Sequence, residues 1–147
     1  LWGLREGVPE AQRHEGTGSI KHDVSVPVSR VSEFLREANK RVHQQMPAAR
    51  ICAFGHMGDG NIHYNVNQPF EMDKDMFLDQ WDIFKKIIHD LVNDMDGSVS
   101  AEHGIGLLKR EDMATYKNPV ALDLMRAVKQ TLDPQNIMNP GKVLPDG

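Results

Sequence analysis

Polar and apolar residues alternate from Lys21 to Val28. This period of two predicts a strand with one buried face, and Pro27 predicts that the strand ends there or lies at the edge of a sheet. Ahead of this strand, we expect a helix only over residues 2–6 and a loop over His14–Ser19, whose composition is typical of turns.

Helical spacing of apolar residues begins after this strand. It predicts a helix that is capped by Ser29 or Ser32, continues to about Met46 and is stopped by Pro47. A longer helix is predicted from about Asp73 to Met95, because Met and aromatic residues mark one side of that segment. Short strands are predicted at Ile51–Phe54, Ile62–Val66 and Ser98–Ala101.

The order of these elements predicts the fold class. Strand, helix, strand, strand, helix, strand is the split βαβ pattern of a ferredoxin-like α+β sandwich, an antiparallel sheet with helices on one face. A C-terminal helix is predicted over Pro119–Leu132, followed by a turn-rich tail over Asp133–Leu144. We predict one domain over residues 1–147, and the composition of Leu1–Glu6 leads us to expect a piece of a longer polypeptide.

The composition argues against several classes of function. Lys and Arg number 17 against 21 Asp and Glu, a net charge of −4, so no nucleic-acid partner and no polybasic membrane anchor are expected. Cys52 is the one cysteine; it excludes an internal disulfide framework and is predicted to be buried in a strand. The sequence has no apolar run near the roughly 20 residues of a transmembrane helix and no signal-peptide pattern.

The segment Gly55–Asn65 has the clearest candidate chemistry. Asp59-Gly60 is a two-residue hairpin signal, and with these residues as the loop His56 faces His63. Directly opposed side chains have Cβ atoms roughly 4.5–5.5 Å apart, close enough for two imidazoles to share a metal ion. The alternative is a pair of surface histidines, which a slip of one residue in the turn would place on opposite faces.

A second cluster, Ser100–Gly106, adds Glu102 and His103. His56, His63 and Glu102 form a set of two histidines and one carboxylate, which leaves a coordination position open, as in catalytic metal sites. Without a cysteine ligand, zinc, manganese, iron or cobalt would fit. If the strand continues, His103 points away from Glu102, and it reaches the same substrate only if the following glycines bend the chain; otherwise it faces solvent.

Three motifs occur together and in order: Gly55–His63, Ser98–Gly106 and Asn139–Lys142. They resemble the C-terminal domain of FAD-linked D-2-hydroxy acid dehydrogenases, flavoenzymes of the vanillyl-alcohol-oxidase superfamily that include D-lactate dehydrogenase, the glycolate oxidase flavin subunit and D-2-hydroxyglutarate dehydrogenase. The resemblance extends from Leu1 to Leu144. It implies an FAD cofactor bound mainly by an FAD-binding domain upstream of this chain, and an inactive fragment in its absence.

The resemblance also implies roles for single residues. His56, His63 and Glu102 correspond to the ligands of a divalent metal, usually zinc, that holds the substrate hydroxyl and carboxylate. His103 corresponds to the general base that takes the hydroxyl proton while a hydride moves to the flavin. The other implied site residues are Arg5, Lys21 and Asn65, which bind substrate, and Asn139, which lies near the flavin.

The resemblance further implies a D-2-hydroxy acid substrate. The Arg5/Lys21 pair favours the D-2-hydroxyglutarate branch over the lactate branch, because two positive groups suit a second carboxylate. The implied electron acceptor is an electron-transfer flavoprotein, a quinone or a cytochrome. The implied location is the bacterial cytoplasm or the mitochondrial matrix, in a soluble or peripherally membrane-associated form. A homodimer is one oligomeric state that the sequence leaves open.

Two other classes of function stay open from the sequence. In the first, the sheet is a non-catalytic metal-binding or assembly domain, and the metal only stabilises the hairpin by cross-linking its two strands. The second is a metal-dependent hydrolase, which needs a positioned water and a carboxylate base; Glu102 cannot easily be both ligand and base. The open coordination position, together with His103 and Arg5, favours the dehydrogenase.

Overall fold

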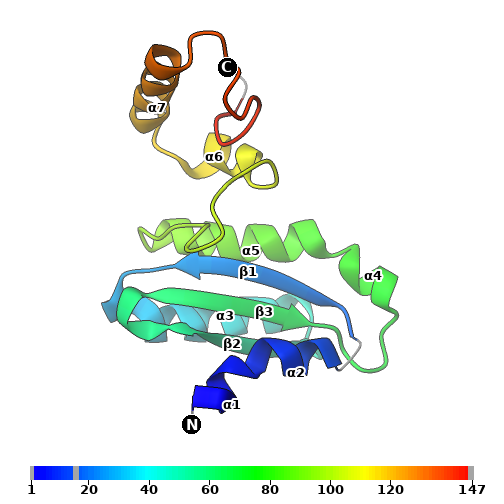
Figure 1. The fold of residues 1–147 in the computed structure, drawn as a ribbon. Helices are drawn as coiled ribbons and strands as arrows, with labels where there is room; N and C mark the ends of the chain where they lie inside the picture. The colour runs from blue at the N-terminus through cyan, green and yellow to red at the C-terminus, as the bar shows by residue number, and fades with distance from the viewer. Residues whose placement is uncertain (1, 15–16, 146–147) are drawn as a thin grey trace. The chain divides into compact units, whose positions relative to one another are not determined.

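The computed structural model describes residues 2–14 and 17–145 (Figure 1). Leu1 and the Glu15–Gly16 part of the predicted loop lie outside the described residues. The chain forms two compact units, Leu1–Ala101 and Glu102–Gly147. None of the helices in the described part of the chain is long and apolar enough to cross a bilayer.

The first unit is built on a three-stranded antiparallel sheet. Its strands are β1 (Ser19–Ser25), β2 (Arg50–His56) and β3 (Asn61–Asn67), in the spatial order β1-β3-β2. Strand β1 ends two residues before Pro27, which agrees with the breaking effect of that proline. The α+β sandwich predicted from the sequence is therefore confirmed.

The fourth strand of the ferredoxin-like prediction, Ser98–Ala101, is not formed. Ser98 makes only an isolated antiparallel bridge with Ser25. The Ser98 hydroxyl donates to the carbonyl of Ser100 at 3.0 Å and accepts from the Ser100 N–H at 3.3 Å. These local bonds compete with a sheet ladder, so no second bridge follows, although the Ala101 N–H still donates to the Asp23 carbonyl at 3.2 Å.

The helices of the first unit follow the predicted pattern with one difference. Helix α3 (Val31–Gln45) lies where it was predicted, but the predicted long helix is divided into α4 (Lys74–Leu78) and α5 (Trp81–Asp94). Asp73 caps α4, because its carboxylate accepts the N–H groups of Asp75 and Met76. Between the two helices the chain tightens into a turn in which the Gln80 N–H donates to the Phe77 carbonyl.

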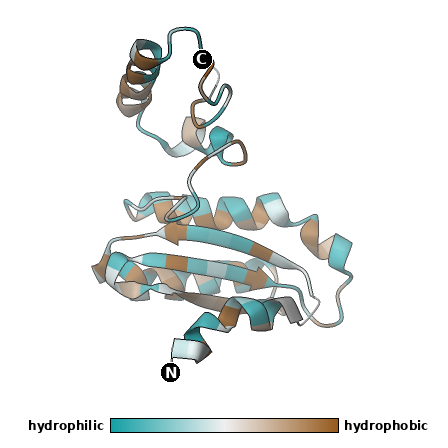
Figure 2. Cartoon of the chain, in the orientation of Figure 1, coloured by the Kyte–Doolittle hydropathy of each residue, from teal (hydrophilic) through white to brown (hydrophobic). Residues whose placement is uncertain are grey.

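Helices α3 and α5 cover the same face of the sheet. Phe34 of α3 packs against Tyr64 of β3 with ring centres 5.8 Å apart, and His22 of β1 contacts His89 of α5 at 6.1 Å. Tyr64 and His22 are opposite each other in the β1–β3 register, so both contacts lie on one face. Hydrophobic and hydrophilic residues alternate along the strands (Figure 2), which leaves a polar face on the other side.

Burial of this apolar face also affects Tyr64. Its hydroxyl donates to the Asn39 side-chain oxygen at 2.8 Å, and burial raises the pKa of Tyr64. A buried neutral hydroxyl with a hydrogen-bond partner is a stable part of a core, because no charge is taken out of water. Tyr64 therefore joins β3 to α3 through both its ring and its hydroxyl.

The second unit contains α6 (Arg110–Tyr116) and α7 (Pro119–Leu132). Helix α7 has the predicted bounds, and the Asn118 side chain caps it by accepting the Val120 N–H at 2.9 Å. Helix α6 was not predicted. The tail that follows α7 has no helix in its described residues, as expected, and Asn136 and Asn139 adopt positive φ in its turns.

Asp133 organises the start of this tail. Its carboxylate accepts the N–H groups of Ile137 and Met138, both at 2.9 Å, and pairs with the ammonium group of Lys129. The hydrogen bond from Lys129 is the main cause that holds the pKa of Asp133 below its ordinary value, against the opposing effect of burial. The ionised form of Asp133 is thus the form that the folded tail favours.

We expect Asp133→Asn to loosen the tail between residues 133 and 138. In the unmodified protein, ionised Asp133 stabilises the folded tail. Because its pKa is lowered by folding, this stabilisation is complete above about pH 4, the pKa of an unfolded aspartate. It is lost as the pH falls through the lower pKa of the folded state. Amide hydrogen exchange of Ile137 and Met138 at several pH values measures this. Asp123→Asn is the control, since Asp123 pairs with Arg126 on the surface of α7, and it should leave the exchange unchanged.

Candidate functional site

The hairpin between β2 and β3 is wider than predicted. Residues 57–60 form its loop, with a 3-10 turn at Met57–Asp59 and Gly60 in the left-handed region at φ 67°. His56 therefore lies opposite Asn61, and His63 lies opposite Phe54. The prediction that His56 and His63 face each other directly is wrong.

A contact with another part of the chain explains the wider loop. The Gly60 carbonyl accepts the N–H of Val26 at 3.1 Å, and any side chain at position 60 would collide with the Val26 carbonyl oxygen. Because the register shift is two residues and the side-chain period is also two, His56 and His63 remain on one face. They are diagonal neighbours, for which Cα atoms are typically about 7–8 Å apart.

Three successive rows of side chains on the polar face of the sheet carry the candidate residues, beside a fourth row of Ser19, Asn67 and Arg50. The strand registers place Lys21, Asn65 and Cys52 in the first row, Asp23, His63 and Phe54 in the second, and Ser25, Asn61 and His56 in the third. Four of the predicted site residues thus share one face, namely Lys21, His56, His63 and Asn65. Cys52 belongs to this face and is half-buried, so the prediction of a buried cysteine is wrong.

Two short helices at the start of the chain contact the same face (Figure 1). They are α1 (Trp2–Glu6), as predicted, and α2 (Val8–His14), which was not predicted. The Asn65 side-chain amide donates to Gln12 of α2 at 2.7 Å. The guanidinium of Arg5 lies over the Phe54 ring, 5.1 Å from its centre. Arg5 therefore joins the group of predicted site residues.

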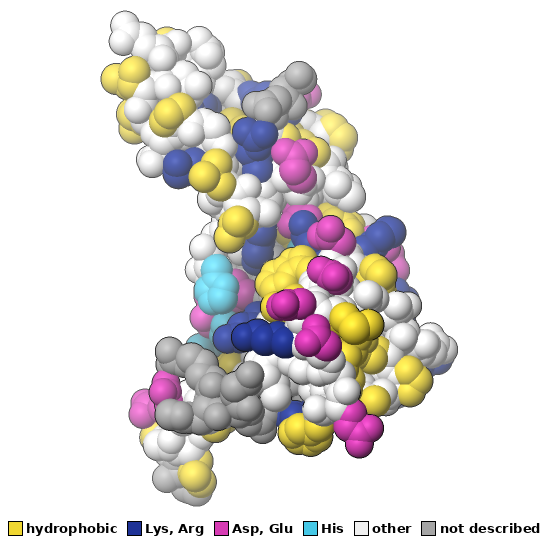
Figure 3. Space-filling view, turned by 90° about the vertical axis from the view of Figure 1, so that its right-hand side faces the viewer, with side chains coloured by type: hydrophobic (Ala, Val, Ile, Leu, Met, Phe, Trp, Pro, Cys, Tyr) yellow, Lys and Arg dark blue, Asp and Glu magenta, His cyan; other side chains and the backbone are white. Residues whose placement is uncertain are grey.

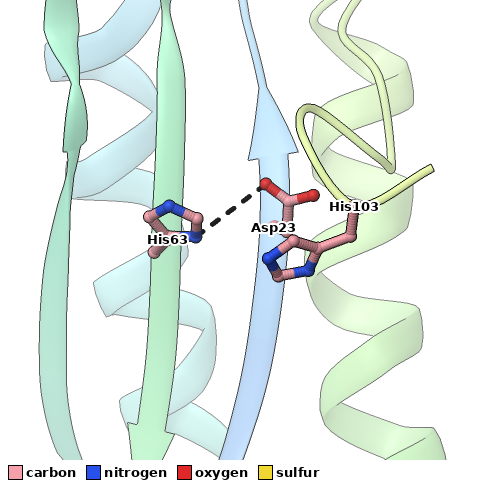
Figure 4. Close-up of side chains that lie close together, drawn as sticks. All are labelled: Asp23, His63 and His103. Atoms are coloured by element: carbon pink, nitrogen blue, oxygen red, sulfur yellow. Dashed lines mark ion pairs between the residues drawn. The ribbon is translucent and has the colours of Figure 1, made fainter. Parts of the chain in front are cut away.

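Asp23 is a residue of this face that sequence reasoning missed. Its side chain is 2% exposed, and its Oδ1 lies 3.8 Å from Nδ1 of His63, whose side chain is 16% exposed. Figure 4 shows the carboxylate and the imidazole directed toward each other from β1 and β3. The alternation that placed Lys21 on the polar face also placed Asp23 there, so the signal was present in the sequence.

Glu102 and His103 follow directly after the first unit. The N–H of Ala101, its last residue, donates to the Asp23 carbonyl at 3.2 Å. His103 is also labelled in Figure 4. Two peptide steps span at most about 7 Å, so the Cα atom of His103 lies within that distance of the Cα atom of Ala101. The backbone bends at Ala101–His103 instead of continuing as a strand, and the strict alternation predicted for Glu102 and His103 therefore does not apply.

Asn139 lies in the second unit. It adopts φ 47° in the tail and borders an open groove of about 540 Å³ formed by α7 and the tail. The groove is largely apolar, with lysine side chains among its lining residues. The apolar residues that line it are Leu124, Met125, Val128, Leu132, Met138, Val143 and Leu144.

Charged side chains of both signs are interspersed over the face of the protein that Figure 3 shows. Among the side chains coloured there, Lys and Arg do not form one continuous area. This distribution agrees with the net charge of −4.

A model of the family of FAD linked oxidases, C-terminal domain, matches residues 1–143 of this chain. The chain belongs to this family. Among curated relatives, the D-2-hydroxyglutarate dehydrogenase of Stutzerimonas stutzeri is 41% identical over 143 residues, 97% of this chain and 30% of the relative. The mitochondrial D-2-hydroxyglutarate dehydrogenase of Danio rerio is 38% identical over 146 residues, 99% of this chain and 26% of the relative.

A putative mitochondrial D-lactate dehydrogenase of Schizosaccharomyces pombe is 34% identical over 151 residues, 97% of this chain and 28% of the relative. The chain therefore spans less than a third of the length of these three relatives. The resemblance found from the three motifs is confirmed at the level of the family, and FAD is the cofactor that this family implies.

The donor set on the polar face fits a divalent cation. His56 and His63 supply imidazoles from one face of the sheet, and the Asp23 carboxylate lies beside His63. Nitrogen and oxygen donors of this kind suit zinc, manganese, iron or cobalt. The chemistry of the residues therefore agrees with the metal that the resemblance implies.

For FAD, the described residues fit a peripheral contact. Gly104 and Gly106 have positive φ, but α6 begins four residues after Gly106, and no glycine-rich loop runs directly into a helix N-terminus in residues 2–14 and 17–145. The groove beside Asn139 offers an apolar surface with a polar border, which suits part of a planar ring system.

Proposed function

We propose that this chain is the substrate- and metal-binding part of a flavin-dependent D-2-hydroxy acid dehydrogenase of the D-2-hydroxyglutarate type. The observation that carries the proposal is the gathering of Lys21, His56, His63 and Asn65 on one face of the sheet, with Arg5 over it. These residues come from four separate segments of the chain. The names of the relatives support the choice of substrate class.

Arg5 and Lys21 bind the carboxylates of the substrate. A guanidinium presents a planar pair of donors that matches a carboxylate, and an ammonium acts as a compact positive charge. Lys21 is exposed and lies opposite Asn65 in the sheet. Two separate cations suit a dicarboxylate such as 2-hydroxyglutarate better than they suit lactate.

Asn65 and His103 act at the substrate hydroxyl and its neighbours. The Asn65 amide now donates to Gln12, and a substrate oxygen replaces this acceptor when it binds. His103 takes the hydroxyl proton on a ring nitrogen, the role of a general base. His56, His63 and Glu102 hold the divalent metal, which would, when bound, polarise the hydroxyl and lower its pKa.

Asn139 contacts the flavin from the second unit, and a separate upstream domain binds most of the FAD. The flavin, when bound, would accept the hydride from the substrate carbon. The electrons then pass to an electron-transfer flavoprotein, a quinone or a cytochrome. Two of the relatives described above have names that place them in mitochondria, and we propose the mitochondrial matrix or the bacterial cytoplasm as the location.

Anaerobic flavin reduction in the complete protein tests this proposal. D- and L-2-hydroxyglutarate and D- and L-lactate are each mixed with the oxidised enzyme, before and after treatment with a chelator, and the flavin absorbance is followed. We expect rapid bleaching by one D-acid, its loss with the chelator and its recovery with zinc or manganese. Absence of bleaching by all four acids, with flavin and metal both bound, would leave the non-catalytic metal-binding domain as the better explanation.

A further inference from the structure

We infer that Asp23 is the positioning carboxylate of His63, which holds the imidazole with its proton on Nδ1 and leaves the Nε2 lone pair available to a cation. Asp23 Oδ1 and His63 Nδ1 lie 3.8 Å apart (Figure 4). This separation exceeds the length of a direct hydrogen bond. A side-chain movement of about 1 Å closes it.

Burial makes this contact more than incidental. The Asp23 side chain is 2% exposed, and a carboxylate taken out of water requires donors or positive charge nearby. The imidazole N–H of His63 is a donor of the required kind. In a site of low dielectric constant, a carboxylate beside one ring nitrogen strongly favours the tautomer that places the proton there.

The backbone of Asp23 is fixed on two sides. Asp23 pairs with His63 in the β1–β3 register, and its carbonyl accepts the Ala101 N–H at 3.2 Å. The backbone of Asp23 therefore stays beside β3, and only rotation of the side chain changes the distance between the carboxylate and the imidazole. The same backbone bond holds the end of the first unit, from which the chain continues into Glu102 and His103.

The His63 ring is also restrained from its other side. Its centre lies 5.1 Å from the centre of the Phe54 ring, with an angle of 39° between the planes. Phe54 and Asp23 come from the strands on either side of β3, so the imidazole is held between them. A ring that is held in this way and donates Nδ1–H to a carboxylate has the arrangement found in many histidine–metal sites.

Two measurements on the complete protein test this inference. In metal-free protein labelled with ¹⁵N-histidine, long-range ¹⁵N–¹H spectra report the tautomer of each imidazole, with His63 assigned by comparison with His63→Gln. We expect His63 to be protonated on Nδ1, and to shift toward the Nε2-protonated form in Asp23→Asn. Zinc affinity, measured by competition with a chelator, should fall by about 10–100-fold in Asp23→Asn.

Asp112→Asn is the matched control, because Asp112 is another buried aspartate and lies in α6. It should change neither the His63 tautomer nor the zinc affinity. The spectrum of the unsubstituted protein needs no variant, so misfolding of Asp23→Asn would not prevent the test. Circular dichroism and amide spectra show whether the variant is folded.

The zinc measurement rests on the proposed function, whereas the tautomer measurement does not. His63 protonated on Nε2 in the unsubstituted protein, or an unchanged tautomer in folded Asp23→Asn, overturns the inference. Loss of zinc as complete as in His63→Ala, with the tautomer unchanged, also overturns it and makes Asp23 a direct ligand. A tautomer switch in a protein that binds no zinc supports the role of Asp23 and rejects the proposed metal site.

Discussion

His103→Ala in the complete enzyme should slow flavin reduction by the D-2-hydroxy acid on the order of 10²-fold or more, the usual contribution of a general base. The metal content should stay the same, because His103 is not one of the three proposed ligands. Stopped-flow measurement of flavin reduction at saturating substrate gives the rate, and elemental analysis gives the metal. Substrate affinity should change much less than the rate, since the proton is transferred only in the transition state.

The pH profile separates this role from a structural one. With His103 present, the rate of flavin reduction should rise with pH and then level off, because a general base must be neutral to accept the proton. His103→Ala should remove that step. His43→Ala is the control, because His43 lies on α3 and contacts the Ala49 carbonyl; a loss of rate equal to that of His103→Ala would contradict the assignment.

His63→Ala in the complete enzyme should abolish stoichiometric metal. His63 lies at the centre of the middle strand, between Asp23 and Phe54, and its removal takes away one of three proposed ligands. We expect a loss of affinity greater than the roughly 10–100-fold typical of residues behind the ligands. Elemental analysis after gel filtration and zinc titration of the metal-free protein measure this.

The comparison with His56→Ala refines the same prediction. His56 is exposed and lies beside the hairpin loop, so its removal should weaken the metal without disturbing the sheet. His43→Ala again serves as the control and should retain the metal. Stoichiometric metal in folded His63→Ala would reject the assignment of His63 as a ligand. The metal would then be bound by Glu102 and by residues outside this chain.

Local sequence patterns predicted most of the secondary structure. Helix α7 and the start of α4 were predicted because their start signals are local: Pro119 lacks the N–H that has no partner at the first helical position, and Asp73 accepts the first N–H groups of α4. The alternation of β1 and the polar face of β3 were also predicted correctly, since alternation is a property of the local backbone. Helix α6 was missed because it is short and its seven residues, Arg110–Tyr116, contain little apolar periodicity.

The errors at the hairpin and at the fourth strand have a common cause, which is a hydrogen bond that sequence patterns do not reveal. Asp59-Gly60 has the composition of a two-residue turn, but Gly60 is bonded to Val26, more than thirty positions earlier. Ser98–Ala101 alternates like a strand, but the Ser98 hydroxyl bonds to the Ser100 backbone. In both places the observed bonds displaced the expected pairing.

The sequence by itself determined the class of fold, the family and the polar residues that share one face of β3, because these depend on composition, alternation and the order of three motifs. Only the tertiary structure decided which of those residues are neighbours. The register of β3 between β1 and β2 made His56 and His63 diagonal and placed Asp23 beside His63. Register is set by contacts between distant segments, and a shift of two residues preserves every local pattern while changing each partner across the sheet.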